Sequence, residues 1–303
     1  MAHFINPFVD FGFKYIFGRE ESKIFLIDFL NQLLRNEPNF SEIVDLEYLD
    51  KEQSRSDRHE RGIIYDIHCR TSNGKRFIVE MQNQGQPYFF DRIIYYSSRG
   101  VVEQGRVGAD WEFDYLPVYC VSFMNFVLKG YEDQFRIDVG LCNLKTGQLF
   151  TDKQRYIFIQ TPLFDKKNPE DCKTGFDKWM YNIINMPTMD TIAFTEEKYL
   201  FDKLAKVTSY ASLSREEKRA YDADLKAYRD IRGQLKYSRM EGIEEGRKEG
   251  RVEGRKEGRQ EGRQEEKISL AKALAEKGMS AEFIADVVKL TVDNVRQIID
   301  NKK

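Results

Sequence analysis

The sequence predicts an α/β domain built on a mixed β-sheet, followed by a charged tail. Segments with strand and helix patterns alternate through residues 20–237. Hydrophobic residues make up 41% of the chain and aromatic residues 13%, which is enough for a large core. At Glu241 the composition changes abruptly to a glycine-rich charged repeat. We therefore expect three parts in the 303 residues: 1–237, 238–266 and 267–303.

The first part has elements in the order α-β-β-β-α-β, with strands and helices added after them. Hydrophobic residues at helical spacing predict the first helix over 20–35. Runs of strand-forming residues then predict strands over 43–49, 62–71 and 75–82. The remaining predictions are a helix over 87–104, strands over 115–128, 135–144 and 155–164, and a largely helical stretch from about 170 to 237.

Composition excludes several classes of protein. No apolar stretch approaches the ~18 residues of a membrane span, and the N-terminus lacks the pattern of a signal peptide. The cysteines have no CxxC spacing, which argues against a zinc site and for reduced thiols in a cytoplasmic protein; they are Cys69, Cys120, Cys142 and Cys172. With a net charge of -2, binding to nucleic acid would need a local basic face.

Two carboxylates interrupt the strand-forming segment YDIHCRTSNGKRFIVEMQNQ, residues 65–84. Asp66 and Glu80 stand among apolar residues, where an unpaired charge is costly. A two-residue turn at Asn73-Gly74 would send them to opposite faces of the sheet. A three-residue loop, Ser72-Asn73-Gly74, with Gly74 in the left-handed region, places Asp66 directly opposite Glu80. We adopt the second register, in which the Cβ atoms lie roughly 5 Å apart.

Two carboxylates this close repel each other, and a hard divalent cation with oxygen ligands relieves the repulsion. The alternative is that each acid pairs with an Arg or Lys on an exposed face. His68 shares the carboxylate face, but a strand histidine is more often a core or rim residue, so it is not included in the site. Arg92 and Tyr96, one helical turn apart, could contact a phosphate, support the metal ligands or simply stack on each other.

Four stretches in order resemble the recombination-promoting nuclease/putative transposase family, which has a PD-(D/E)XK restriction-endonuclease-like core. They are DFGFKYIFG at 10–18, YDIHC at 65–69, VEMQNQ at 79–84 and DRIIYYSSR at 91–99. The Glu-Gly repeat is also typical of that family. The resemblance implies a DNA endonuclease that uses Mg²⁺ or Mn²⁺, with Asp66 and Glu80 as metal ligands. We take Arg92 and Tyr96, from their spacing, as the candidate substrate-binding residues.

The resemblance also implies catalytic roles for Gln82 and Lys14. In the general nuclease pattern a lysine follows the glutamate by two positions, and here that position is Gln82, which cannot supply positive charge. Lys14 is the candidate for the missing cation; the alternative is a surface lysine. Asp10 is either a third metal ligand or a helix-capping acid, and we favour the cap. The rival function is a catalytically weakened nuclease fold that binds DNA or serves as an oligomeric interaction protein.

The tail carries glycine at every fourth position from 242 to 262, with parallel stripes of Glu and Arg. Each glycine costs a helix about 1 kcal/mol relative to alanine. The repeat is therefore a flexible tether or a helix stabilised by self-association, and we expect a homo-oligomer formed through the tail. In the last part, Gly278 ends one helix, Ser280 caps the next, and Thr291 or Asp293 starts a third. This helix-turn-helix pattern favours a small helical bundle that binds other proteins over one that binds DNA.

Overall fold

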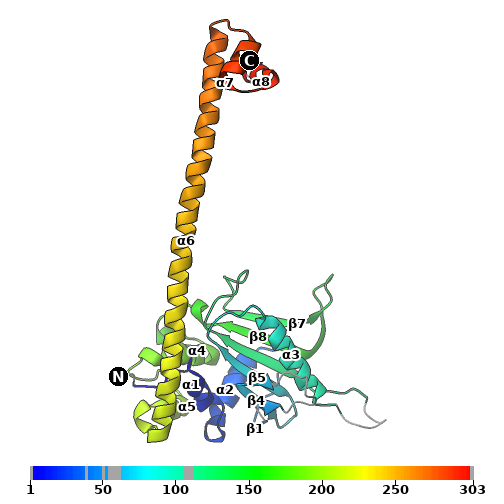
Figure 1. Cartoon of the computed structure of the whole chain (residues 1–303). Helices are drawn as coiled ribbons and strands as arrows, with labels where there is room; N and C mark the ends of the chain where they lie inside the picture. Colours follow the sequence, from blue (N-terminus) through cyan, green and yellow to red (C-terminus); the bar gives the residue numbers. More distant parts are fainter. Residues whose placement is uncertain (1–2, 38–39, 50–51, 54–62, 106–111, 301–303) are drawn as a thin grey trace. The chain divides into compact units, whose positions relative to one another are not determined.

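The computed structural model describes residues 3–37, 40–49, 52–53, 63–105 and 112–300. The chain divides into two compact units, Met1–Tyr228 and Arg229–Lys303, and the division falls within one long helix. We describe each unit by itself. Figure 1 shows their elements, coloured along the sequence.

The first unit contains a six-stranded mixed sheet in the order β1-β4-β5-β6-β8-β7. Strand β5 is antiparallel to β4 and parallel to β6, and β6 is in turn parallel to β8. This arrangement confirms the predicted α/β fold class with a mixed sheet. The strands are β1 Leu46–Tyr48, β4 Ile67–Thr71, β5 Arg76–Gln82, β6 Val118–Met124, β7 Arg136–Cys142 and β8 Leu149–Gln160.

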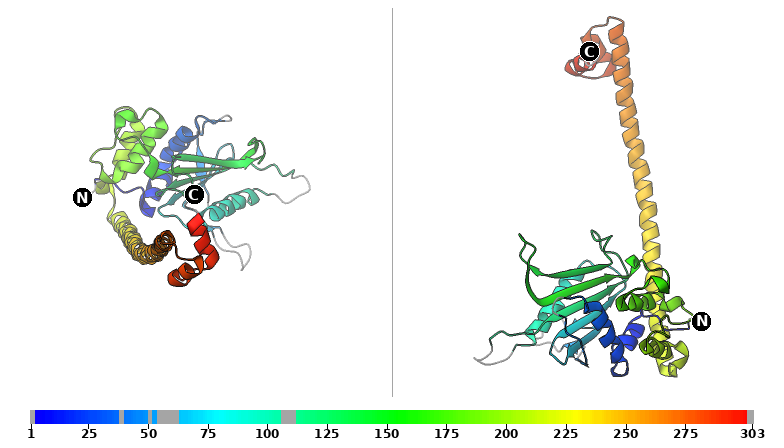
Figure 2. Two further views of the ribbon diagram at one scale, coloured as in Figure 1. Left: turned by 90° about the horizontal axis from the view of Figure 1, so that it is seen from above. Right: turned by 180° about the vertical axis from the view of Figure 1, so that it is seen from behind.

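Helices cover both faces of this sheet, as Figures 1 and 2 show. Helix α3 packs on one face, over a core cluster that includes Ile78, Ile93 and Phe158. The other face carries the larger, Phe-rich cluster, which includes Phe13, Phe29 and Trp179. The helices are α1 Asp10–Phe17, α2 Lys23–Leu34, α3 Phe89–Val102, α4 Gly175–Asn185, α5 Tyr199–Thr208 and α6 Arg215–Glu276.

Three elements differ from the sequence prediction. The strand expected over 62–71 is broken before Ile67: β3, Ile63–Ile64, pairs with β2, Glu52–Gln53, in a separate ribbon. Gly62 lies outside the described residues. Strand β8 begins earlier than expected, because its first residues are polar or solvent-exposed and carry no apolar run. Helix α1 was not predicted as a helix; it is only 8 residues long, too short to show a clear period.

The hairpin between β4 and β5 has the predicted three-residue loop. The Thr71 amide donates to the Lys75 carbonyl at 2.9 Å, and Gly74 has φ of +84°. The ladder pairs Ile67 with Val79. Continued by one residue, this register sets Asp66 opposite Glu80, so the predicted register is confirmed.

In the second unit the glycine repeat is helical, as part of α6, so the flexible-tether alternative is wrong. Two short helices follow, α7 Ala281–Val288 and α8 Val292–Asp300. The predicted boundaries are confirmed: Gly278 has φ of +77°, Ser280 accepts the Phe283 amide, and the Thr291 hydroxyl accepts the Asn294 amide. Within the described residues, no helix combines the length and the apolar character needed to cross a membrane.

We expect Gly→Ala to have opposite effects in two helices of this chain. A Cβ at Gly12 in α1 would lie 2.0 Å from the Asn6 carbonyl oxygen, so Gly12→Ala should destabilise the first unit by about 2 kcal/mol or more through overpacking. At Gly254 in α6 a Cβ meets nothing within 4 Å, so Gly254→Ala should favour the helix. Urea unfolding followed by circular dichroism measures both. Equal stability of Gly12→Ala and the unaltered protein would contradict the close packing at α1.

Candidate active site

Asp66 and Glu80 form a reciprocally bonded pair across the β4–β5 hairpin. The Asp66 amide donates to Glu80 Oε1 at 3.3 Å, and the Met81 amide donates to Asp66 Oδ2 at 2.9 Å. Asp66 lies just before β4, at the break between β3 and β4. Glu80 is only 4% exposed, which rules out the alternative of exposed ion pairs for this residue.

The two carboxyl groups lie in an environment that favours their neutral forms. Burial raises the pKa of Glu80 to about 8, and the nearby Asp66 carboxylate adds to this shift. Burial likewise raises the pKa of Asp66, although the bond from Met81 and the charge of Lys14 oppose the shift. Burial is therefore the dominant influence on both carboxyl groups, and the nearby positive charges offset only part of it.

Polar side chains surround Glu80 on the face that α3 covers. Gln82, two residues further along β5, donates from Nε2 to Glu80 Oε2 at 3.3 Å. Ser122 stands beside Glu80 in the parallel β5–β6 ladder and is fully buried. Its hydroxyl has no hydrogen-bond partner among the residues that the structure describes. The sequence analysis missed Ser122, although a lone polar residue in the apolar run VYCVSFM is a usable signal.

Lys14 reaches the pair from helix α1. Its Nζ lies 2.7 Å from Asp10 Oδ1 and 3.9 Å from Asp66 Oδ1. The side chain is 29% exposed, so the lysine is not a fully solvated surface group. Asp10 does not cap the helix, because Val9 is the N-cap residue and makes no side-chain capping bond. The preference for a capping role was therefore wrong; the Asp10 carboxylate binds Lys14 instead.

Arg92 and Tyr96 extend the site from α3. Arg92 Nη1 donates to Gln86 Oε1 at 2.7 Å, while its Nε and Nη2 are buried without a hydrogen-bond partner among the described residues. The guanidinium carbon lies 5.9 Å from the centre of the Tyr96 ring, so the alternative of a contact between the two side chains is present, and their role in substrate binding stays a prediction. The positive charge of Arg92 lowers the pKa values of both Asp66 and Glu80, opposing the effect of burial.

His68 is 2% exposed, and its ring lies 4.8 Å from that of Tyr65. It is a core residue, consistent with its exclusion from the predicted site.

The residues present fit a hard divalent cation. Asp66 and Glu80 offer carboxylate oxygens, the ligands that Mg²⁺ prefers, and Mg²⁺ sites often use one or two carboxylates with water and phosphate completing the shell. The described part of the chain contains no cluster of three or more His, Cys, Asp or Glu side chains placed to hold a metal. A metal here would therefore depend on two carboxylates and on ligands from solvent and substrate.

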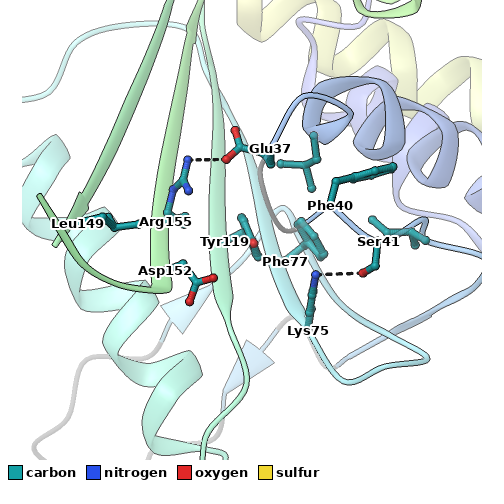
Figure 3. A pocket seen from close by; sticks show the side chains of 11 residues that line it. Glu37, Phe40, Ser41, Lys75, Phe77, Tyr119, Leu149, Asp152 and Arg155 are labelled. Atoms are coloured by element: carbon teal, nitrogen blue, oxygen red, sulfur yellow. Dashed lines mark hydrogen bonds and ion pairs between the residues drawn. The ribbon is translucent and has the colours of Figure 1, made fainter. Parts of the chain in front are cut away.

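A cavity of about 150 Å³ lies elsewhere, near the beginning of β5 and β6 (Figure 3). Phe77 and Tyr119 line it with stacked rings, and Arg155 donates to Glu37 at its edge at 2.9 Å. Phe77 belongs to the Phe-rich cluster, and since side chains alternate along a strand, Glu80 points to the other face. None of the predicted site residues lines this cavity.

Comparison with known proteins gives one family. A family model described as PD-(D/E)XK nuclease family transposase matches residues 7–238 of the chain. Comparisons with curated proteins and with solved structures gave no match.

In the metal-free protein, we expect Glu80→Gln to stabilise the fold at alkaline pH. The folded protein holds the Glu80 proton up to about pH 8, whereas the usual pKa is 4.5. Stability is therefore lost as pH rises through this window, because the unfolded chain releases the proton more easily. Glutamine has no proton to release, so Glu80→Gln avoids this loss of stability. Its free energy of unfolding should exceed that of the unaltered protein by a few kcal/mol above pH 8, and the two should be equal near pH 4.5.

Urea unfolding across this pH range in the presence of EDTA measures the effect. Glu42→Gln, at an exposed position, is the control and should change nothing. A pH-independent difference between Glu80→Gln and the unaltered protein would contradict the raised pKa.

Proposed function

Since the chain belongs to the family of PD-(D/E)XK nuclease transposases, we propose that it is a metal-dependent DNA endonuclease that hydrolyses phosphodiester bonds. Family membership supports a nuclease-like function, and the facing carboxylates Asp66 and Glu80 are the observation that carries the finer proposal. Their burial and raised pKa values are typical of groups arranged for chemistry rather than for stability. The link to recombination or mobile elements rests on the family description.

Asp66 and Glu80 would hold Mg²⁺ or Mn²⁺. When bound, such an ion polarises the scissile phosphate and lowers the pKa of an attacking water. The hydrogen bonds from the Asp66 and Met81 amides keep the two carboxyl groups oriented before any cation arrives. Cation binding requires the ionised carboxylates, so affinity should rise with pH as the Glu80 proton is lost.

The other residues of the site would act on the water and on the phosphate. The Gln82 amide, next to Glu80, can orient a water but cannot neutralise charge. Lys14 and Arg92 would supply positive charge to stabilise the negative charge that develops on the phosphoryl group during the reaction. Nε and Nη2 of Arg92, which are buried and have no hydrogen-bond partner among the described residues, are suited to phosphate oxygens. Tyr96 would hold the guanidinium in place through its ring.

Gln82 favours a second candidate function. Without a lysine at this position, the fold could bind DNA while cleaving it slowly or not at all, and act as a DNA-binding or oligomeric interaction protein. A plasmid-nicking assay with Mg²⁺, repeated with EDTA, separates the two functions.

We expect Asp66→Ala and Glu80→Ala each to lower DNA cleavage at least a hundredfold, because each removes a ligand of the proposed metal. Thermal unfolding should show that both variants still fold. Binding of Mn²⁺ to the purified protein, measured by calorimetry, should be lost in both. Glu42→Ala serves as the control for removing a carboxylate at an exposed position. Cleavage by Asp66→Ala at the unaltered rate would refute the assignment.

We also propose that the tail forms homo-oligomers. The Glu and Arg stripes of α6 place like charges four residues apart, which destabilises an isolated helix. A neighbouring helix offers each stripe an opposite charge, and the repeat glycines leave room for close approach. The small bundle that follows has its own core around Ile284 and Val295. It also exposes apolar side chains that a partner could cover: Leu270, Met279, Phe283 and Val287.

The full-length protein should therefore be a dimer or larger, and a variant ending at residue 237 should be a monomer. Two nicks make a double-strand break only when two sites act on one duplex, so the shortened protein should still nick but rarely cut both strands. Light scattering gives the masses, and plasmid gels give the ratio of nicked to linear product. If both proteins have the mass of a monomer, the tail does not form homo-oligomers.

A further inference from the structure

Helix α1, which carries Lys14, receives its cap from a distant part of the chain. Its N-cap residue, Val9, has no side-chain acceptor to offer. The amide of Phe11, in the first turn, instead donates to Asp224 Oδ2 at 3.0 Å, across 213 residues of sequence. A carboxylate that accepts an amide of the first turn does what an N-cap side chain does, and its charge also opposes the helix dipole. Asp224 thus caps α1 from α6.

Further contacts hold the segment before α1 against the same turns of α6. The Tyr221 hydroxyl accepts the Asn6 amide at 2.9 Å, and its ring lies 5.9 Å from that of Phe11. Beyond α1, Arg19 binds Glu217 at 3.1 Å. Gly12 packs so closely on the Asn6 carbonyl that a Cβ there would clash. Residues 217–224 therefore help to fix the position of α1, together with the packing of this helix in the Phe-rich cluster.

This arrangement matters because Lys14 lies one turn after the capped end of α1. Its Nζ is 3.9 Å from Asp66 Oδ1, near the limit of an ion pair, so a small movement of α1 would separate them. Asp66 and Glu80, by contrast, are held by the β4–β5 hairpin and do not depend on α1 for their hydrogen bonds. Loss of the cap should thus displace the lysine and leave the carboxylates in place.

We propose that Asp224 is a positioning residue that holds Lys14 against the carboxylate pair by capping helix α1. The role rests on the proposed nuclease function, in which Lys14 supplies positive charge to the reacting phosphate. The first turns of α6 are then part of the catalytic domain, although the same helix continues into the tail.

The test compares Asp224→Ala, Asp224→Asn and the control Asp230→Ala, an exposed position on the same helix. Asp224→Ala should lower kcat about fivefold, which is the typical free energy of one lost cap converted to a rate ratio. KM for DNA and affinity for Mn²⁺ should not change. Asn also accepts an amide hydrogen bond, so Asp224→Asn should restore most of the rate. Asp230→Ala should match the unaltered protein.

A double-mutant cycle shows whether the effect passes through Lys14. In a Lys14→Ala background, Asp224→Ala should lower kcat no further, because the group that it positions is gone. The same fivefold loss in both backgrounds would overturn the proposal, as would a loss of Mn²⁺ affinity in Asp224→Ala.

Hydrogen exchange keeps this test separate from that of the nuclease function. If the unaltered protein does not cleave DNA, the proposed function fails, but the capping role is still measurable. Asp224→Ala should then speed amide exchange in the first turn of α1, at Phe11 to Phe13, whereas Asp230→Ala should not. Unchanged exchange in Asp224→Ala would show that the cap does not hold α1.

Discussion

The length of the loop between β4 and β5 sets the geometry on which the rest of the site depends. A three-residue loop, with Gly74 in the left-handed region, aligns Ile67 with Val79 and so places Asp66 opposite Glu80. A shift of one residue would send every side chain of one strand to the other face of the sheet. Glu80 would then face the Phe-rich cluster, and no carboxylate pair would exist.

Burial of this pair is costly to the fold, and the surroundings reduce the cost without removing it. Backbone amides of the hairpin bind one oxygen of each acid, yet the pKa of Glu80 remains raised. On the α3 side, Arg92 keeps two buried donors without an acceptor among the described residues. A structural ion pair would bring these groups together. Among the described residues no ion pair joins Arg92 to either acid, so both the guanidinium and the carboxyl groups can still bind a charged ligand.

Short-range patterns in the sequence were enough to predict the hairpin, its register and most of the sheet. Ser72-Asn73-Gly74 is compatible with the three-residue loop, and runs of strand-forming residues predict the strands beside it. Features that depend on distant residues were out of reach. No local pattern shows that Asp224 caps α1. The ion pair between Asp10 and Lys14 is local, at i,i+4 spacing, but it was missed because no helix was predicted there. The helical form of the glycine repeat was also left open, because intrinsic propensity argues against it.

The hydrogen bond between Phe11 and Asp224 joins residues 213 positions apart, whereas Asp66 and Glu80 are separated by 14. The two contacts therefore form at different stages of synthesis. The hairpin can close as soon as it leaves the ribosome, because its loop is short. Helix α1 is translated first, but its capping residue, Asp224, is translated only when nearly all of the first unit has been made. Both carboxylates thus leave the ribosome long before the residue that caps the lysine's helix, and the site can be completed only late in synthesis.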